Sequence, residues 1–118
     1  MISFAPESGV PAGPAARMEE VFSPGGLLSG ANNYEFRPQQ LLMAQGVAET
    51  LARGGHLVTE AGTGTGKSLA YLVPSVLTAM EEGRKAIIST HTINLQEQLL
   101  YKDLPLVAKL LPQEFDAA

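Results

Sequence analysis

The sequence predicts an α/β fold in which helices flank a parallel sheet. Two segments, 38–53 and 67–80, repeat apolar side chains at helical spacing. Two shorter apolar segments, 56–60 and 85–90, have the length and composition of strands, and a glycine-rich loop directly follows the first of them. A strand, a helix and a second strand in this order form a βαβ unit. We therefore expect part of such a sheet, truncated after about two strands.

Composition and charge limit the kinds of partner. The 118 residues include 45% hydrophobic and 17% charged residues, as in a globular domain, and their net charge is −4. A negative domain does not wrap nucleic acid by bulk positive charge, so any contact with DNA would be local. No apolar run reaches the roughly 18 residues of a membrane span, so we expect no membrane partner. The sequence has no cysteine and no signal peptide, which fits a cytoplasmic location.

The chain is expected to divide near residue 17. Residues 1–17 are rich in Pro, Gly, Ala and Ser and predict a flexible N-terminal tail. Residues 18–118 form the domain, which begins with a helical turn at 18–22.

The first long helix is expected to begin at Pro38, because the missing N–H of proline suits the first helical position. It ends at Gly54, since glycine favours the backbone conformation that closes a helix. One face of this helix is apolar and is formed by Leu41, Ala44, Ala48 and Leu51.

Two further helices follow. The second runs from 67 to 80, and Pro74 inside it predicts a kink. A broad apolar face is formed by Leu69, Leu72, Val73, Val76, Leu77 and Met80. The third starts near Thr92, after the second strand, and Pro105 interrupts it.

The loop between the first strand and the second helix reads Ala61-Gly-Thr-Gly-Thr-Gly-Lys67-Ser68, a phosphate-binding pattern. Its glycines let backbone N–H groups point inward as a cradle, and the following helix adds the positive end of its dipole. Lys67 can reach the β- and γ-phosphates of ATP, and the Ser68 hydroxyl suits Mg²⁺. We predict these two as the catalytic residues and Ser68 as the metal ligand. Glu60, just before the loop, has two interpretations, a catalytic base or, as we favour, a carboxylate that shapes the loop.

The segment Arg37-Pro-Gln-Gln40 lies upstream of the loop and predicts recognition of adenine. A glutamine amide can donate to N7 and accept from N6 of adenine, so Gln40 is the candidate. Tyr34 or Phe36 could stack on the base, and Arg37 could support the ring or a phosphate. The alternative is that Gln40 is a solvated helix residue. The predicted nucleotide-binding set is Arg37, Gln40, Ala61, Gly62, Thr63, Gly64, Thr65, Gly66, Lys67, Ser68 and Leu69.

Hydroxyl and amide side chains gather where the second strand leads into the third helix. Such a junction offers polar groups to a phosphate of a nucleic-acid strand. The alternative, equally weighted, is that Thr90 or Thr92 caps the helix. The candidate nucleic-acid-binding residues are Thr90, His91, Thr92, Asn94 and Gln96.

Three segments together resemble the DinG/XPD-like branch of superfamily 2 helicases. Tyr34-Glu-Phe-Arg37-Pro-Gln-Gln40-Leu is similar to the adenine-reading Q motif of that family. The loop Glu60-Ala-Gly-Thr-Gly-Thr-Gly-Lys67-Ser68 is similar to its motif I, and helicase loops of this kind tolerate alanine at position 61. Ser89-Thr-His-Thr-Ile-Asn-Leu-Gln96 is similar to motif Ia, which contacts single-stranded DNA in that family. The resemblance covers about 18–112.

The resemblance implies an ATP-dependent DNA helicase that moves 5′ to 3′ in repair or replication. Its P-loop domain is RecA-like, its cofactors are ATP and Mg²⁺, and its partner is single-stranded or forked DNA, bound by a monomeric motor. No Asp-Glu-x-His follows residue 68. We therefore expect 18–118 to be the N-terminal part of the first motor domain, in a fragment that does not hydrolyse ATP alone. A [4Fe-4S] cluster, if present, would belong to a missing downstream part.

Two other classes stay open. The first is a different P-loop protein, such as a small nucleotide kinase or a transport ATPase. The second is a truncated, non-catalytic module that binds nucleotide or a partner. Gln40→Ala separates the helicase from the first class, because only there should it weaken ATP binding more than GTP binding.

Overall fold

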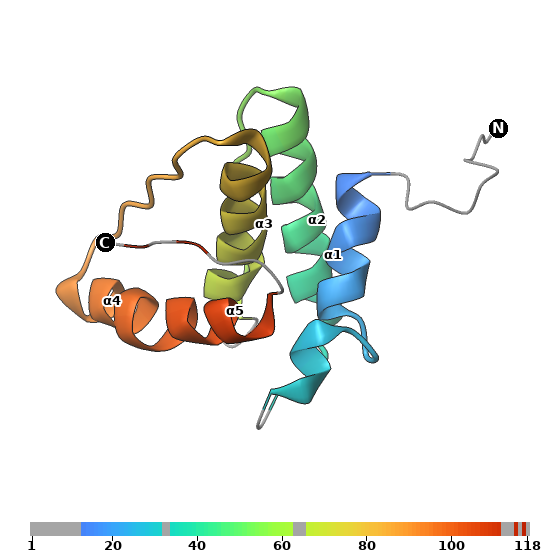
Figure 1. Cartoon of the computed structure of the whole chain (residues 1–118), viewed down its shortest axis with the longest axis horizontal. Coiled ribbons are helices and arrows are strands. Elements are labelled where there is room, and N and C mark those ends of the chain that lie inside the picture. Colours follow the sequence, from blue (N-terminus) through green and yellow to red (C-terminus); the bar gives the residue numbers. More distant parts are fainter. Residues whose placement is uncertain (1–12, 32–33, 63–65, 112–114, 116, 118) are drawn as a thin grey trace, which may run out of the picture.

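The computed structural model describes residues 13–31, 34–62, 66–111, 115 and 117. In order, its elements are α1 (Pro14–Phe22), η1 (Leu27–Gly30), α2 (Pro38–Arg53), α3 (Lys67–Glu82), α4 (Ile93–Gln98), η2 (Leu99–Asp103) and α5 (Leu104–Leu110). Helix α2 packs between α1 and α3, and the continuous α4–η2–α5 segment contacts α3 through η2 (Figure 1). Helices α2 and α3 run in the same direction, so their first turns lie at the same end of the molecule (Figure 1).

Helix α1 begins at Pro14, earlier than the helical turn expected at 18–22. Met18, Val21 and Phe22 are buried in the core. The Nε2 atom of Gln45 donates to the carbonyl oxygen of Ala15 over 3.2 Å, which joins α1 to α2. Residues 14–17 are therefore part of a packed helix. The other residues that we expected to be flexible include 1–12, which lie outside the described residues.

The predicted bounds of α2 are confirmed. The helix begins at Pro38 and is closed by Gly54, whose φ of 82° suits glycine. Ala44 and Ala48 of the predicted apolar face are buried in the core, whereas Leu51 is exposed.

Helix α3 confirms the predicted start at Lys67 and extends to Glu82, two residues beyond the expected end. Pro74 is buried within it, and the helix continues past this residue. Gly83 closes it in the left-handed conformation, with a φ of 65°. Its other buried apolar residues are Ala70, Leu72, Val73, Val76 and Leu77, and all of them except Leu72 belong to the hydrophobic core.

The structure does not confirm the predicted sheet. Segments 56–60 and 85–90 are extended, but the described part of the chain contains no strand. Val58 is 97% exposed and Ile87 is 91% exposed, whereas the apolar composition of 85–90 had favoured a buried second strand. An extended segment becomes a strand only when a neighbouring strand pairs with its N–H and C=O groups. Neither segment has such a neighbour among the described residues.

The last helical region changes its hydrogen-bond register instead of breaking at Pro105. Over η2 the helix is a π-helix, and the N–H of Leu104 donates to the carbonyl oxygen of Leu99, five residues earlier. Proline has no N–H to donate to Tyr101, so a wider turn ahead of Pro105 accommodates the missing bond. No helix among the described residues is long and apolar enough to cross a membrane.

Candidate nucleotide-binding site

The N-terminal end of α3 carries the candidate phosphate site. Gly66 is the N-cap residue, with φ 78° and ψ 41°, a left-handed conformation that favours glycine. Lys67, the first helical residue, is exposed, and Ser68 is partly buried. Because free N–H groups and the positive dipole end meet at this turn, the site suits an anion.

Gln40 connects this turn to α2. Its side chain is only 2% exposed. Its Nε2 atom donates to the carbonyl oxygen of Gly66 over 3.0 Å, and its Oε1 atom accepts from the Tyr34 hydroxyl over 2.9 Å. The alternative of a solvated glutamine is therefore wrong. Adenine recognition by Gln40 stays a prediction, and both ends of the amide already have protein partners.

Arg37 and Tyr34 complete the surroundings of Gln40. Arg37 precedes α2 and lies beside Gly66, because its Nη1 atom would be 3.7 Å from a Cβ at that position. Its Nη2 atom is 3.8 Å from a carboxylate oxygen of Glu35. Burial raises the pKa of Tyr34 above the usual 10.0, and the positive charge of Arg37 acts in the opposite direction. The Tyr34 hydroxyl is therefore neutral, and a donor, at physiological pH.

Tyr34 is the residue whose role sequence reasoning missed. We considered its ring as a surface for stacking on a base. In the structure the ring packs against the core, and the hydroxyl lies within bonding distance of Gln40 and of the Phe22 carbonyl oxygen, at 3.3 Å. No spacing signal in the sequence predicts a hydroxyl contact between a residue in a connecting segment and the following helix.

The rest of the predicted loop is described only in part. Ala61 is partly buried and Gly62 is exposed, while Leu69 packs against the core. The predicted residues Thr63, Gly64 and Thr65 lie outside the described residues. Glu60 is exposed, and neither of its two interpretations is tested.

The donor set fits Mg²⁺ bound together with phosphate. Ser68 supplies one hydroxyl in the first turn of α3, next to the exposed Lys67. No cluster of three acidic or histidine residues that could hold a metal exists among the described residues. Mg²⁺ is commonly held by one or two protein oxygens together with phosphate oxygens and water. When bound, the ion would neutralise phosphate charge, and Ser68 would be its ligand in this chain.

The predicted nucleic-acid residues lie at the start of α4. The Thr92 hydroxyl accepts from the N–H of Leu95 over 3.2 Å, so the capping alternative is confirmed for Thr92. The Thr90 hydroxyl donates to the Thr92 carbonyl oxygen over 3.1 Å. His91, Asn94 and Gln96 are exposed. Nucleic-acid contact by this segment stays a prediction.

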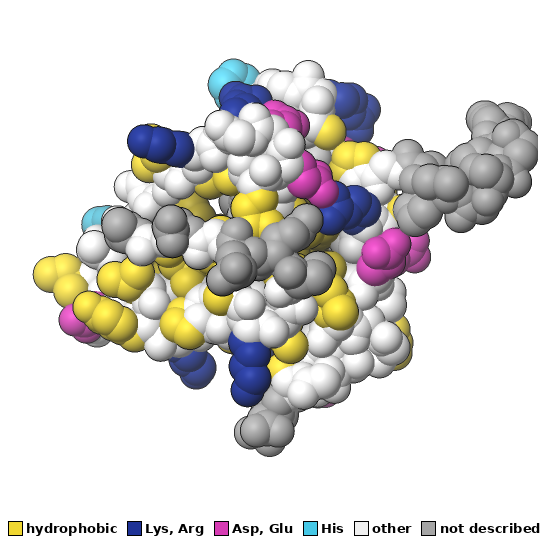
Figure 2. Space-filling view, in the orientation of Figure 1, with side chains coloured by type: hydrophobic (Ala, Val, Ile, Leu, Met, Phe, Trp, Pro, Cys, Tyr) yellow, Lys and Arg dark blue, Asp and Glu magenta, His cyan; other side chains and the backbone are white. Residues whose placement is uncertain are grey.

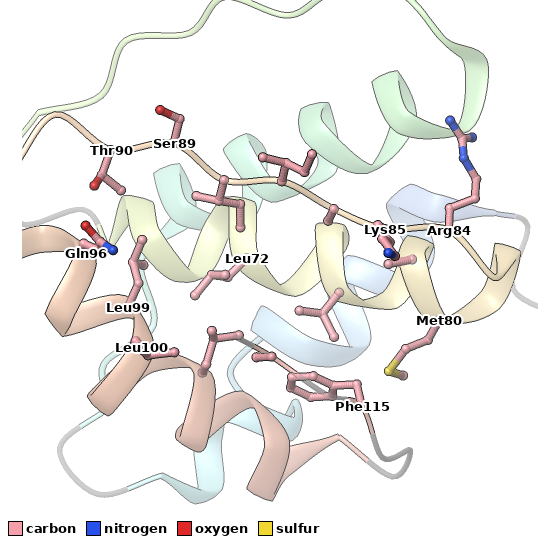
Figure 3. A pocket seen from close by; sticks show the side chains of 17 residues that line it. Leu72, Met80, Arg84, Lys85, Ser89, Thr90, Gln96, Leu99, Leu100 and Phe115 are labelled. Atoms are coloured by element: carbon pink, nitrogen blue, oxygen red, sulfur yellow. The ribbon is translucent and has the colours of Figure 1, made fainter.

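A groove of about 850 Å³ lies between α3, the extended segment 84–90 and α4–η2. Leu72 and Leu99 point into it, and Phe115 lies at one side (Figure 3). None of the described phosphate-loop residues lines it. Hydrophobic side chains gather over α4 on the face in Figure 2, where Lys and Arg side chains stand apart from one another. The groove is therefore separate from the described residues of the candidate phosphate site.

A family model described as "DEAD/DEAH box helicase" matches residues 42–108, which is more than half of the chain. The chain belongs to this family. Relatives include proteins named "ATP-dependent DNA helicase DinG", 50% identical in Photobacterium profundum and 46% identical in Escherichia coli K12, each over 84 residues. The matches cover 67% and 69% of the chain but only 12% of either relative. Membership implies a RecA-like P-loop fold, and the helicase resemblance found from the sequence is confirmed.

Proposed function

We propose that this chain binds ATP with Mg²⁺, as the N-terminal part of the first motor domain of an ATP-dependent DNA helicase. The contact between Gln40 and Gly66 is the observation that carries the proposal. It joins the segment predicted to recognise adenine to the turn predicted to hold phosphates. The relatives' name and the DEAD/DEAH box match support the helicase class over other P-loop proteins.

Each binding role falls to a described side chain. Lys67 is exposed at the start of α3, so its side chain can approach the β- and γ-phosphates. The N–H groups and the positive dipole end of the first turn of α3 would stabilise the negative charge of these phosphates. Arg37 lies beside the same turn and supplies a second positive charge. The N–H of Gln40 that does not face Gly66 is the group for adenine N7. We also propose that segments 56–60 and 85–90 are strands of a parallel sheet when the P-loop domain is complete.

Single-stranded or forked DNA is the proposed second ligand. His91, Asn94 and Gln96 are exposed polar residues close in sequence, and side chains of this kind contact phosphates and sugars. The 5′ to 3′ direction, the monomeric state, the cytoplasmic location and a cluster in another part of the protein are further predictions. Hydrolysis by these 118 residues alone is not expected, since the Asp-Glu-x-His that would orient water is absent from the sequence.

Titration of the chain with fluorescent ATP and GTP analogues tests the proposal. ATP should bind, and Gln40→Ala should weaken ATP binding more than GTP binding. Equal losses for both nucleotides would favour a P-loop protein of another class. A chain that binds neither nucleotide, while circular dichroism shows it folded, would contradict the proposal.

A further inference from the structure

The amide of Gln40 has one orientation, and the reason lies in its two partners. The Gly66 carbonyl oxygen can only accept a hydrogen bond, so the NH₂ group of Gln40 must face it. The Oε1 atom then faces the Tyr34 hydroxyl, which donates to it over 2.9 Å. A flipped amide would place two acceptors together at Gly66. The Tyr34 hydroxyl thus donates to the oxygen of the amide, whereas Gly66 accepts from its nitrogen.

The Gln40 amide in turn holds the end of the phosphate loop. Gly66 immediately precedes Lys67, and its carbonyl oxygen accepts from both Gln40 and the N–H of Ala70, at 3.0 and 3.3 Å. Both lone pairs of that oxygen therefore accept a hydrogen bond. Loss or displacement of the Gln40 amide would remove one of these hydrogen bonds and so alter how the loop enters α3.

We propose that Tyr34 is a positioning residue for phosphate binding, which acts through the Gln40 amide on Gly66. The inference rests on the proposed function, that this loop binds the phosphates of ATP. Tyr34 contacts no predicted ligand atom itself, because its ring packs against the core and its hydroxyl points to Gln40. Its effect through Gly66 is on the phosphates and therefore occurs with a ligand that has no base. Stacking on adenine, the other role for Tyr34, would depend on the ring and on the base.

The test is isothermal titration of the chain with MgATP and with inorganic tripolyphosphate, which has the phosphates and no base. Tyr34→Phe keeps the ring and removes the hydroxyl. We expect it to weaken tripolyphosphate by about tenfold, as for the loss of one hydrogen bond in a buried network, and MgATP by at least as much. Tyr101→Phe is the matched control, because Tyr101 is exposed on η2, and it should leave both affinities unchanged.

A double-mutant cycle tests the route through Gln40. Gln40→Met removes both amide contacts at similar volume. It should weaken tripolyphosphate like Tyr34→Phe, and MgATP by more, because the proposed contact with adenine is lost as well. In the Gln40→Met background, Tyr34→Phe should have no further effect, because the group through which it acts is gone. Additive losses would overturn the inference. Gln40→Met also serves as the second variant if Tyr34→Phe reduces the helical content of the chain.

Hydrogen exchange of the Gln40 side-chain amide, followed by NMR in the free chain, distinguishes failure of the proposed function from failure of the positioning role alone. Protection in the wild-type chain that is lost in Tyr34→Phe supports the arrangement without any ligand. If the amide is protected but the wild-type chain binds neither ligand, the proposed function fails and the positioning role fails with it. If the wild-type chain binds both ligands and Tyr34→Phe binds them equally well, only the positioning role is overturned.

Discussion

The side-chain amide of Gln40 donates to the carbonyl oxygen of Gly66 over 3.0 Å and so joins the first turns of α2 and α3. The two residues are 26 positions apart. Gly66 has no side chain, and a Cβ built on it would collide with the Nε2 atom of Gln40. The close approach of the helices at this point therefore requires glycine for two reasons, its left-handed backbone and the space that Gln40 occupies.

Gly66→Ala should destabilise the fold by more than its backbone strain alone. A non-glycine residue in the left-handed region costs about 1–2 kcal/mol, and the collision with Gln40 adds to this. Gly83→Ala is the matched control, because Gly83 has a similar φ of 65° and a Cβ added there would meet open space, with no contact within 4 Å. Urea denaturation of both variants gives the two losses in the free energy of unfolding. Equal losses would show that the Gln40 contact tolerates a methyl group.

Lys67→Ala should weaken ATP binding without changing stability. The side chain of Lys67 is exposed, so its removal should change the free energy of unfolding by no more than about 0.5 kcal/mol. A hydrogen bond to a charged group contributes about 1.5–3 kcal/mol, which corresponds to roughly a 10- to 150-fold loss of affinity. Titration with a fluorescent ATP analogue measures this loss. Lys109→Ala, in the last turn of α5, is the control of equal charge, and the same loss there would point to a general charge effect.

The bounds of α2 were predictable because the signals that set them are local. Pro38 starts α2 through its missing N–H, and Gly54 ends it through a backbone conformation that glycine adopts easily. Strands have no such local basis. Segments 56–60 and 85–90 have strand composition, but pairing depends on neighbours that no pattern within a segment specifies.

The sequence indicated the residues of the candidate site but not the contacts between them. The residue types of the loop and Gln40 indicated nucleotide binding, because phosphates need backbone N–H groups and a cation. The contact between Gln40 and Gly66 was not predictable, since a bond between residues 26 positions apart depends on how α2 packs on α3. The same is true of the Tyr34 hydroxyl. Spacing shows which residues share a helix face but not which groups meet between helices.

Thr92→Ala should loosen the start of α4, because the hydroxyl that accepts from the Leu95 N–H is lost. Loss of such a cap costs about 1 kcal/mol. Faster hydrogen exchange of the Leu95 amide would report it, and Thr92→Ser should restore slow exchange. An unchanged exchange rate in Thr92→Ala would contradict the capping role.

Asn94→Ala separates nucleic-acid binding from capping at the same helix. Asn94 is exposed, so the variant should keep the stability of the wild-type chain. If this segment contacts single-stranded DNA, the variant should weaken binding by several-fold, since one polar contact is lost. Fluorescence anisotropy with a labelled oligonucleotide at fixed salt measures the affinity. Equal affinities of Asn94→Ala and the wild-type chain would argue against contact at this residue.

The stabilising effect of the Tyr34 hydroxyl should disappear in alkali. Burial raises its pKa in the folded chain above the unfolded value of about 10.0. Below pH 10 the hydroxyl is protonated in both states, so the full stability difference between the wild-type chain and Tyr34→Phe is present there. Above pH 10 the unfolded chain loses this proton first, which favours unfolding, and the difference shrinks until pH passes the folded pKa. Urea denaturation of both chains from pH 7 to 11 measures the difference, and subtraction removes the effects that both chains share. A difference that stays constant to pH 11 would show that the Tyr34 hydroxyl is not protected by the fold.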